Sequence, residues 1–222
     1  MSSDDLKRTA AKAALEEVLP KLGRDGIIGI GTGSTANCFI DLLAEHRGVF
    51  DAAVASSDAS AARLRQHGIA VIDLNAAASI AVYIDGADEV DPQRRLIKGG
   101  GGALTREKIC AASADEFICI VDHTKVVEVL GTFAVPVEVI PMARGLVGRA
   151  IVAAGGTPVL REDFVTDNGN LILDVYGLKL TDPARMETDL NNVVGTVCNG
   201  IFAAQAADRV IVAGPEGTRW LT

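Results

Sequence analysis

The chain has 222 residues, of which 49% are hydrophobic and 23% are charged, and its formal net charge is −8. A chain of this length and composition can bury a core in one large domain or in two small ones. The negative charge argues against a general nucleic-acid binder, because such proteins usually carry a basic face. An anionic ligand must therefore be held by a local cluster of donors.

The four cysteines predict a reducing compartment. Cys38, Cys110, Cys119 and Cys198 lie far apart, form no CxxC pair and stand among apolar residues, as reduced core thiols do. No apolar run approaches membrane-spanning length, and the N-terminal segment lacks the apolar core of a signal peptide. We therefore expect a cytoplasmic protein that binds neither membrane nor nucleic acid.

The first part of the chain alternates helical and strand-like segments. Apolar spacing predicts a helix from Asp4 to Leu19, followed by a strand, a turn and a helix in DGIIGIGTGSTANCFIDLLAEH. A helix from Ser60 to His67 and the strands GIAVIDL, SIAVYIDG and DEFICIVD continue the series. This alternation predicts an open, Rossmann-like α/β fold, in which helices flank a mostly parallel sheet.

From about Gly131 the pattern changes. VPVEVIP places two prolines in a strand-like run, Asn168-Gly169 suits a tight hairpin turn, and DPARMETDLNN favours a helix. These features predict a smaller α+β domain of ferredoxin-like type over residues 131-204, and we expect this domain to make the oligomer contacts. ADRVIVAGPEGT then resembles another buried strand, so the first, catalytic domain is predicted to comprise residues 1-130 plus 205-222.

The segment from Ile84 to Ile109, IDGADEVDPQRRLIKGGGGALTREKI, carries the main candidates for catalysis. Each of its four consecutive glycines would cost roughly 0.5–1 kcal/mol in a helix or strand, which indicates a special backbone role. Their N–H groups, together with the first turn of the following helix, can bind an anion or oxyanion. The alternative, a glycine-rich surface turn, does not account for the flanking charges. These are one cation and three carboxylates suited to proton transfer, namely Lys98, Asp85, Asp88 and Glu107.

An earlier glycine turn allows a second interpretation. Gly31, Gly33 and Ala36 satisfy the GxGxxA pattern, so a dinucleotide-binding fold is the first alternative. That fold also expects an acidic residue at the end of the second strand, but this strand ends in two serines, with Asp58 one position later. The dinucleotide interpretation therefore remains open at this point.

Short hydroxyl side chains favour a single phosphate group instead. Thr32, Ser34 and Thr35 lie in the glycine turn, although helix N-capping is an equally ordinary role for them. The serines of SSDAS are further short donors. GTGST, SSDAS, DGAD and VDHTK all follow predicted strands, and ligands bind at the carboxyl ends of parallel strands. We therefore expect these loops to meet at one edge of the sheet, which makes Lys125 a second candidate cation.

Seven blocks in order resemble the A-type ribose-5-phosphate isomerases from nearly end to end: GIGTGSTA, SSDAS, DGADEVD, KGGGGALTREKI, VPVEVIP, TDNGNLILDV and NGIFAAQAADRVIVAG. The resemblance implies interconversion of D-ribose 5-phosphate and D-ribulose 5-phosphate in the pentose phosphate pathway. It further implies a homodimer or homotetramer without metal or other cofactor. The block VVGTVCNGIF departs from the usual family pattern, in which a glutamate or similar residue precedes the asparagine-glycine pair.

The resemblance also implies which residues bind substrate. A lysine near the N-terminus that helps to hold the phosphate corresponds to Lys7, with Lys12 as the alternative because the spacing to GTGST is longer here. The proton acceptor corresponds to Glu107. The remaining positions are Thr32, Gly33, Ser34 and Thr35 in TGST, Asp85, Gly86, Ala87 and Asp88 in DGAD, Lys98, Gly99, Gly100 and Gly101 in KGGG, and Lys125.

The chemistry of the reaction fits these residues independently. Moving a carbonyl between adjacent sugar carbons needs a base to transfer a proton through an enediolate, and we assign this role to Glu107. A carboxylate with a pKa of about 4.3 is a weak base, so we expect partial desolvation to raise the pKa of Glu107 toward neutrality. Lys98 and the glycine N–H groups would stabilise the negative oxygen. Asp88 would move protons between the two oxygens and Asp85 would help to open the ring, although these two roles are exchangeable.

Two alternative functions and the possible need for a metal ion are considered next. An amino-sugar-phosphate deaminase of the same fold would release ammonia, and a sugar-phosphate sensor would bind its ligand without converting it. His46, His67 and His123 show no paired metal-ligand spacing. We therefore expect activity to survive chelators.

Overall fold

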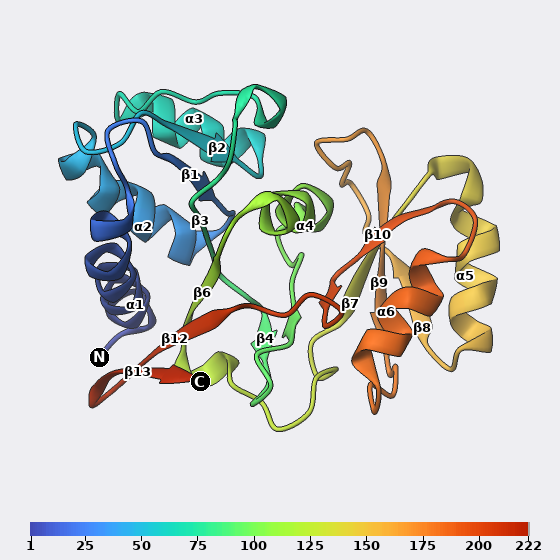
Figure 1. Ribbon diagram of the computed structural model, residues 1–222. Helices are drawn as coiled ribbons and strands as arrows, with labels where there is room; N and C mark the ends of the chain where they lie inside the picture. Colours follow the sequence, from blue (N-terminus) through green and yellow to red (C-terminus); the bar gives the residue numbers. More distant parts are fainter. Residues whose placement is uncertain (222) are drawn as a thin grey trace. The chain divides into compact units, whose positions relative to one another are not determined.

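The computed structural model describes residues 1–221 as two compact units (Figure 1). The first unit comprises Met1–Gly86, Arg106–Lys125 and the chain from Ala207 onward. The second comprises Ala87–Thr105 and Val126–Ala206. The chain thus passes between the units several times, and the DGAD motif and the helix that carries Glu107 each include residues of both.

Segments 87–105 and 126–130, together with residues 205–206, account for the difference between this division and the predicted boundaries, 1-130 plus 205-222 and 131-204. The sequence pattern assigned both segments to the first domain. In the structure Leu96–Ile97 pairs with Ile201–Phe202, and the N–H group of Val127 donates to the carbonyl of Val90. These pairings join the segments to the second unit, and the alternation of elements along the chain gives no sign of them. The predicted catalytic and oligomer-contact roles of the two domains stay predictions.

The first unit is built on a six-stranded sheet in the order β13-β12-β6-β3-β1-β2. Neighbouring strands are parallel except for the antiparallel hairpin of β12 and β13. The register places Ile30 beside both Ala55 and Ile84, so the turns that follow β1, β2 and β3 leave the sheet at the same edge. The strands are β1 (Ile27–Ile30), β2 (Ala52–Ala55), β3 (Val82–Asp85), β6 (Phe117–Asp122), β12 (Arg209–Gly214) and β13 (Gly217–Leu221).

Helices flank this sheet, with α1 and α2 on one side and α4 on the other (Figure 1). The first helix begins at a capping box, in which the Asp5 N–H donates to the Ser2 side chain and the Asp5 carboxylate accepts from the Ser2 N–H. Apolar side chains of α1 and α2 share one core with alternate residues of the strands, among them Ile28, Ile84 and Ile120. The helices are α1 (Ser3–Val18), α2 (Ser34–Leu43), α3 (Asp58–Gln66) and α4 (Leu104–Ser113), with short 3-10 turns η1 (Leu19–Lys21), η2 (Ala44–His46), η3 (Leu74–Ala76) and η4 (His123–Lys125).

The second unit is an antiparallel α+β structure. Its main sheet has the order β10-β7-β9-β8, and two helices connect the strands in a β-α-β-β-α-β sequence, which is the ferredoxin-like arrangement. A three-stranded sheet of order β11-β5-β4 accompanies it. The elements are β4 (Glu89–Val90), β5 (Leu96–Ile97), β7 (Val135–Val139), η5 (Pro141–Ala143), α5 (Arg144–Ala153), β8 (Thr157–Leu160), β9 (Leu171–Tyr176), α6 (Pro183–Asn191), β10 (Thr196–Asn199) and β11 (Ile201–Phe202).

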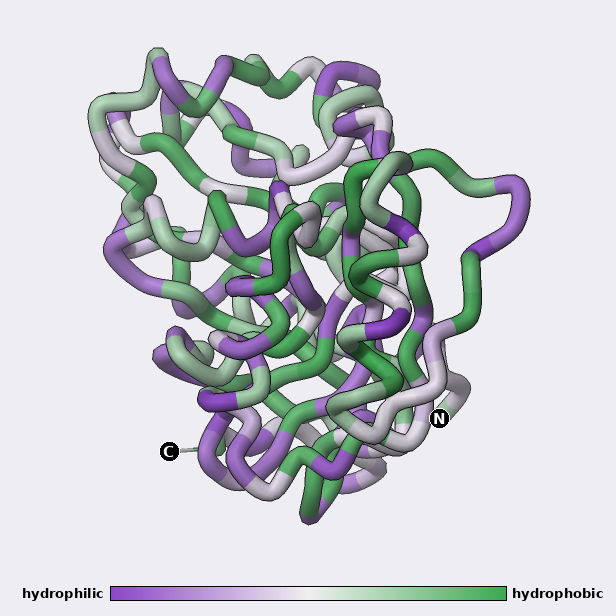
Figure 2. The backbone as a smooth tube through the Cα atoms, turned by 90° about the vertical axis from the view of Figure 1, so that its right-hand side faces the viewer, coloured by the Kyte–Doolittle hydropathy of each residue, from purple (hydrophilic) through white to green (hydrophobic). Residues whose placement is uncertain are grey.

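These two sheets confirm the predicted fold class, a mostly parallel sheet flanked by helices with a smaller α+β part. Hydrophobic and hydrophilic segments alternate at short intervals along the chain (Figure 2). Across residues 1–221 no helix has the length and apolar character needed to cross a membrane. The four cysteines carry no disulfide, and Cys38 alone among them is partly exposed.

Candidate functional site

Asp85 is a buried carboxylate at the carboxyl end of β3. Its side chain is 0% exposed and accepts three hydrogen bonds. Oδ1 accepts from the N–H groups of Thr32 (3.0 Å) and Gly86 (2.7 Å), and Oδ2 accepts from the hydroxyl of Tyr83 (2.6 Å). A buried carboxylate needs such donors in place of water, and these contacts fix the orientation of Asp85.

The first glycine of the GTGST turn makes room for this carboxylate. A Cβ atom on Gly31 would lie 1.9 Å from Cγ of Asp85, far inside van der Waals contact. Glycine at this position is therefore explained by the approach of Asp85, and no dinucleotide is needed to explain it.

Glu107 lies in the first turn of α4 and is 3% exposed. Its charge and that of Asp85 act on the same two buried side chains of the first unit. Burial, followed by the charges of Asp85 and Glu107, raises the pKa of the Tyr83 hydroxyl well above its usual value. The same causes in the same order raise the pKa of the Cys110 thiol to about 12. Tyr83 therefore remains a proton donor to Asp85, and Cys110 remains a neutral thiol at physiological pH.

The GTGST turn presents the beginning of α2 without a side-chain cap. Gly33 is the N-cap residue, its φ is +104°, and no side chain accepts a hydrogen bond there. Gly33 and Ser34 are exposed, and Thr35 is half-buried. Uncapped N–H groups at a helix start, together with hydroxyl side chains, form a suitable environment for a phosphate.

The serines of SSDAS have structural partners. Ser56 is buried and shares a hydrogen bond of 3.0 Å with the Thr32 hydroxyl. Ser57 caps α3 by accepting from the N–H of Ser60, and the Ser60 hydroxyl donates to the carbonyl of Gly31 (2.7 Å). These contacts shape the GTGST turn, and the expectation that Ser56 and Ser57 are phosphate donors stays a prediction.

The lysines predicted near the phosphate differ in their surroundings. Lys7 on α1 is half-buried, pairs with Asp4 at 3.1 Å, and places its charge close enough to α2 to act on the Cys38 thiol. Lys12 is exposed. Lys125 is half-buried at the end of η4, directly after β6. Of the two N-terminal candidates, Lys7 is the one directed toward α2.

The second unit holds the remaining predicted residues. Asp88 is half-buried, and its Oδ2 accepts from the N–H of Gly100 at 2.8 Å. The side chain of Lys98 is 2% exposed, and its Nζ lies 5.6 Å from the ring centroid of Phe202. The N–H of Lys98 donates to the carbonyl of Gly200 at 2.9 Å. The NGIF block therefore holds the segment from β5 to Lys98, because β11 also pairs with β5.

A second buried carboxylate, Glu138 on β7, organises the segment around the start of α4. It is 0% exposed and accepts from the hydroxyls of Thr105 and Thr166 (2.9 Å for Thr166) and from the amides of Asn168 (3.2 Å) and Asn170 (2.9 Å). Thr105 lies two residues before Glu107 on α4. Glu138 thus joins the TDNGN turn to the beginning of the helix that carries the proposed base.

Replacing this carboxylate with its neutral isostere tests that organising role. In Glu138→Gln an amide NH₂ group would face hydroxyl and amide donors, and we expect a loss of about 1–3 kcal/mol in the free energy of unfolding. Urea unfolding measures the change. Glu162→Gln, on an exposed side chain of the same unit, is the matched control. Equal unfolding free energies for the two variants would contradict the role given to Glu138.

The predicted site residues thus fall into two sets. The structure brings Thr32, Asp85 and Gly86 into direct contact in the first unit, and the charge of Glu107 reaches their surroundings. In the second unit it brings Asp88 against the glycine loop. That both sets act on one substrate stays a prediction. Sequence reasoning missed Tyr83, although its position two residues before Asp85 on a strand places both side chains on one face.

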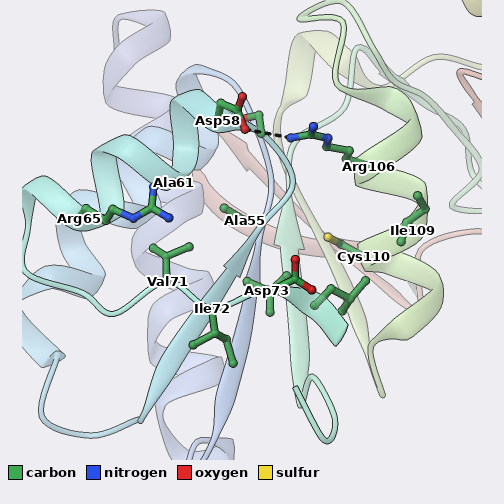
Figure 3. Close-up of a pocket in the computed structure, with 13 residues that line it drawn as sticks. Ala55, Asp58, Ala61, Arg65, Val71, Ile72, Asp73, Arg106, Ile109 and Cys110 are labelled. Atoms are coloured by element: carbon green, nitrogen blue, oxygen red, sulfur yellow. Dashed lines mark hydrogen bonds and ion pairs between the residues drawn. The ribbon is translucent and has the colours of Figure 1, made fainter. Parts of the chain in front are cut away.

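The first unit also contains a pocket of about 470 Å³ (Figure 3). Asp58 and Arg106, which form an ion pair of 2.9 Å, line it together with Ser57, and the residues of TGST, DGAD and KGGG do not. Asp58 was the residue that kept the dinucleotide interpretation open; here it pairs with an arginine of α4. Within the described chain no group of three or more histidine, cysteine or acidic side chains could hold a metal ion.

Comparisons with known proteins give the family. The model of the ribose 5-phosphate isomerase A (phosphoriboisomerase A) family matches residues 52–217. The chain belongs to this family. Ribose 5-phosphate isomerase A from Neisseria gonorrhoeae is 44% identical, with a TM-score of 0.93, over 99% of this chain and 96% of that one.

Two further solved structures agree. A D-ribose-5-phosphate isomerase in complex with phospho-erythronic acid is 40% identical, with a TM-score of 0.93, over 99% of both chains. Ribose 5-phosphate isomerase A from Methanocaldococcus jannaschii is 38% identical, with a TM-score of 0.91, also over 99% of both chains. The predicted family and enzyme class are confirmed: the chain is an isomerase that interconverts ribose 5-phosphate and ribulose 5-phosphate. Family membership also decides against the dinucleotide, deaminase and sensor alternatives.

Proposed function

We propose that isomerisation proceeds through an enediolate, with Glu107 as the base that carries a proton between sugar carbons 1 and 2. The observation that carries this proposal is the burial of Glu107 in the surroundings of Asp85, where both charges act on Tyr83 and Cys110. A carboxylate removed from water is a stronger base than one on the surface. Glu107 lies in the first turn of α4, so the regular backbone of the helix holds its Cα atom in place.

The two aspartates divide the remaining proton transfers. Both oxygens of Asp85 are occupied by donors, so this side chain is suited to orienting the substrate hydroxyl groups and assisting ring opening. Asp88 is half-buried, and its Oδ2 accepts a hydrogen bond from the N–H of Gly100. We therefore assign to Asp88 the transfer of protons between the two oxygens of the enediolate, as the sequence suggested.

Cations and backbone amides hold the negative groups. Lys98 and the glycine loop of Gly99, Gly100 and Gly101 stabilise the enediolate oxygen, and the N–H of Gly100 holds Asp88 beside that loop. Lys7 and Lys125 supply positive charge for the phosphate. Thr32, Gly33, Ser34 and Thr35 offer hydroxyl and amide donors at the start of α2, and Gly86 and Ala87 contribute to substrate binding between the two aspartates.

Removing the base tests the mechanism directly. Glu107→Gln keeps the size of the side chain but cannot accept the carbon-bound proton, so we expect kcat to fall by about 10²- to 10⁴-fold while substrate still binds. Ketose formation from ribose 5-phosphate measures the rate, and calorimetric titration measures binding. Glu216→Gln, on an exposed turn, is the matched control. A near-normal rate for Glu107→Gln would remove Glu107 as the base.

Solvent exchange distinguishes the enediolate from a hydride shift. When ribulose 5-phosphate is converted in D₂O, a base that exchanges its proton with solvent delivers deuterium to carbon 2 of the aldose. Nuclear magnetic resonance of the product at early conversion measures this incorporation. A product without deuterium at carbon 2 would indicate direct hydride transfer.

The reaction is proposed to need no metal ion or other cofactor, because the carboxylates, lysine and amides supply all the acid, base and electrostatic functions. Activity of protein treated with EDTA and then freed of the chelator should equal that of untreated protein. The assay is repeated after adding Mg²⁺, Mn²⁺ or Zn²⁺. Complete loss of activity that one of these ions restores would overturn the metal-free mechanism.

We also propose that the chain acts in the pentose phosphate pathway of the cytoplasm as a homodimer or homotetramer. The second unit offers a surface for such contacts, because several of its large apolar side chains are exposed. They are Ile140, Met142, Leu146, Val152, Val159, Val165 and Val194. Burial of such side chains against a second copy of the chain would remove apolar surface from water and so favour association.

A further inference from the structure

Arg161 is a fixed arginine directly after β8 that the proposed mechanism does not use. Its Nε and Nη2 atoms donate to the two carboxylate oxygens of Asp174 on β9 at 2.9 and 2.5 Å. Its guanidinium carbon lies 5.3 Å from the ring centroid of Phe164. The bidentate pair and the ring restrict the guanidinium to one position and one plane.

The remaining nitrogen of this guanidinium contacts the glycine loop. Nη1 of Arg161 donates to the carbonyl of Gly99 at 3.3 Å and to the carbonyl of Gly100 at 3.2 Å. Two successive carbonyls therefore point toward the same atom. The loop also packs on the same segment of chain, because a Cβ atom on Gly102 would lie 2.1 Å from the Phe164 ring.

These contacts determine where the loop's N–H groups point. In a trans peptide the C=O group and the next N–H group point in opposite directions, and the described chain contains no cis peptide bond. The N–H of Gly100 must therefore point away from Arg161, and it does, since it donates to Asp88 at 2.8 Å. The N–H of Gly101 is turned away from Nη1 by the same rule. Gly101 is exposed, and its N–H makes no hydrogen bond within residues 1–221.

We propose that Arg161 is a positioning residue, which orients the Gly99–Gly100 and Gly100–Gly101 peptide planes so that the Gly101 N–H is presented as an oxyanion donor on the side of Asp88. This inference rests on the proposed enediolate mechanism and deepens it, because it specifies how the glycine loop is held in its active orientation. Donors that are oriented beforehand stabilise a developing negative oxygen without reorganisation, which is where such sites gain their effect. Arg161 itself does not touch the substrate.

Two ligands separate this role from a general effect on folding. Phospho-erythronic acid is a phosphorylated four-carbon sugar acid, and its carboxylate carries negative oxygens as the enediolate does. Ribitol 5-phosphate carries the phosphate and hydroxyl groups but no carbonyl or carboxylate oxygen. Calorimetry measures the affinity of both for the whole chain, and kcat and KM are measured for ribose 5-phosphate. The variants are Arg161→Ala and Arg161→Lys, where lysine keeps the charge but lacks the fork that reaches Asp174 and the carbonyls together.

The control for the variants is Arg185→Ala. Arg185 forms an exposed ion pair with Asp189 on α6 of the same unit, at 2.9 Å, and has no part in the proposed site. This variant is expected to retain wild-type kinetics and wild-type affinity for both ligands. It controls for the loss of an arginine and of an ion pair with aspartate.

For both Arg161 variants we expect kcat/KM to fall at least about tenfold, mainly through kcat, since removing one oxyanion donor costs on the order of 10²–10³-fold. The affinity for phospho-erythronic acid should fall by the same factor and that for ribitol 5-phosphate should stay within about twofold. Equal weakening of both ligands, unchanged catalysis, or full activity of Arg161→Lys would overturn the inference. Wild-type protein that isomerises ribose 5-phosphate but binds phospho-erythronic acid no more tightly than ribitol 5-phosphate would instead remove the oxyanion cradle itself.

Discussion

The burial of the Asp85 carboxylate is the constraint on which the first unit's part of the site depends. A charge with no exposed surface is tolerated only if hydrogen-bond donors replace its water, and three donors from three different positions do so. The requirement extends outward: Gly31 must lack a Cβ, Tyr83 must keep its proton, and the turn containing Thr32 must take one conformation. One buried charge thereby fixes a strand end, a turn and a tyrosine.

The second unit also contains a buried carboxylate that is held by several hydrogen-bond donors, and there it orders loops. Glu138 gathers four side-chain donors around a carboxylate that is 0% exposed, and one of them, Thr105, stands in the first turn of α4. Arg161, held by Asp174, likewise orders the glycine loop, because it donates to the carbonyls of Gly99 and Gly100. A loop rich in glycine has many accessible conformations, so its order must come from outside contacts. These polar contacts supply that order, and the loop can keep its N–H groups available for a ligand.

The sequence allowed most of the fold and the local part of the site to be predicted. Alternating apolar segments determine the elements of a parallel sheet, and DGAD and KGGGG bring chemical groups together within a short stretch of chain. Tyr83 was open to prediction from strand alternation alone. Arg161 and Glu138 were not, because they contact residues 62 and 33 positions away, and nothing in a linear pattern specifies such pairs. The pairing of β5 with β11 is likewise a contact between distant parts of the chain, so the predicted domain boundary did not include it.

The shared surroundings of Asp85 and Glu107 also determine the protonation of the side chains between them. Burial first, and then the charges of Asp85 and Glu107, raise the pKa of Tyr83 and of Cys110. Tyr83 therefore keeps the hydroxyl proton that it donates to Asp85, and Cys110 stays a neutral thiol. Because both groups stay protonated, neither can compete with Glu107 for the proton that the proposed mechanism moves between the sugar carbons.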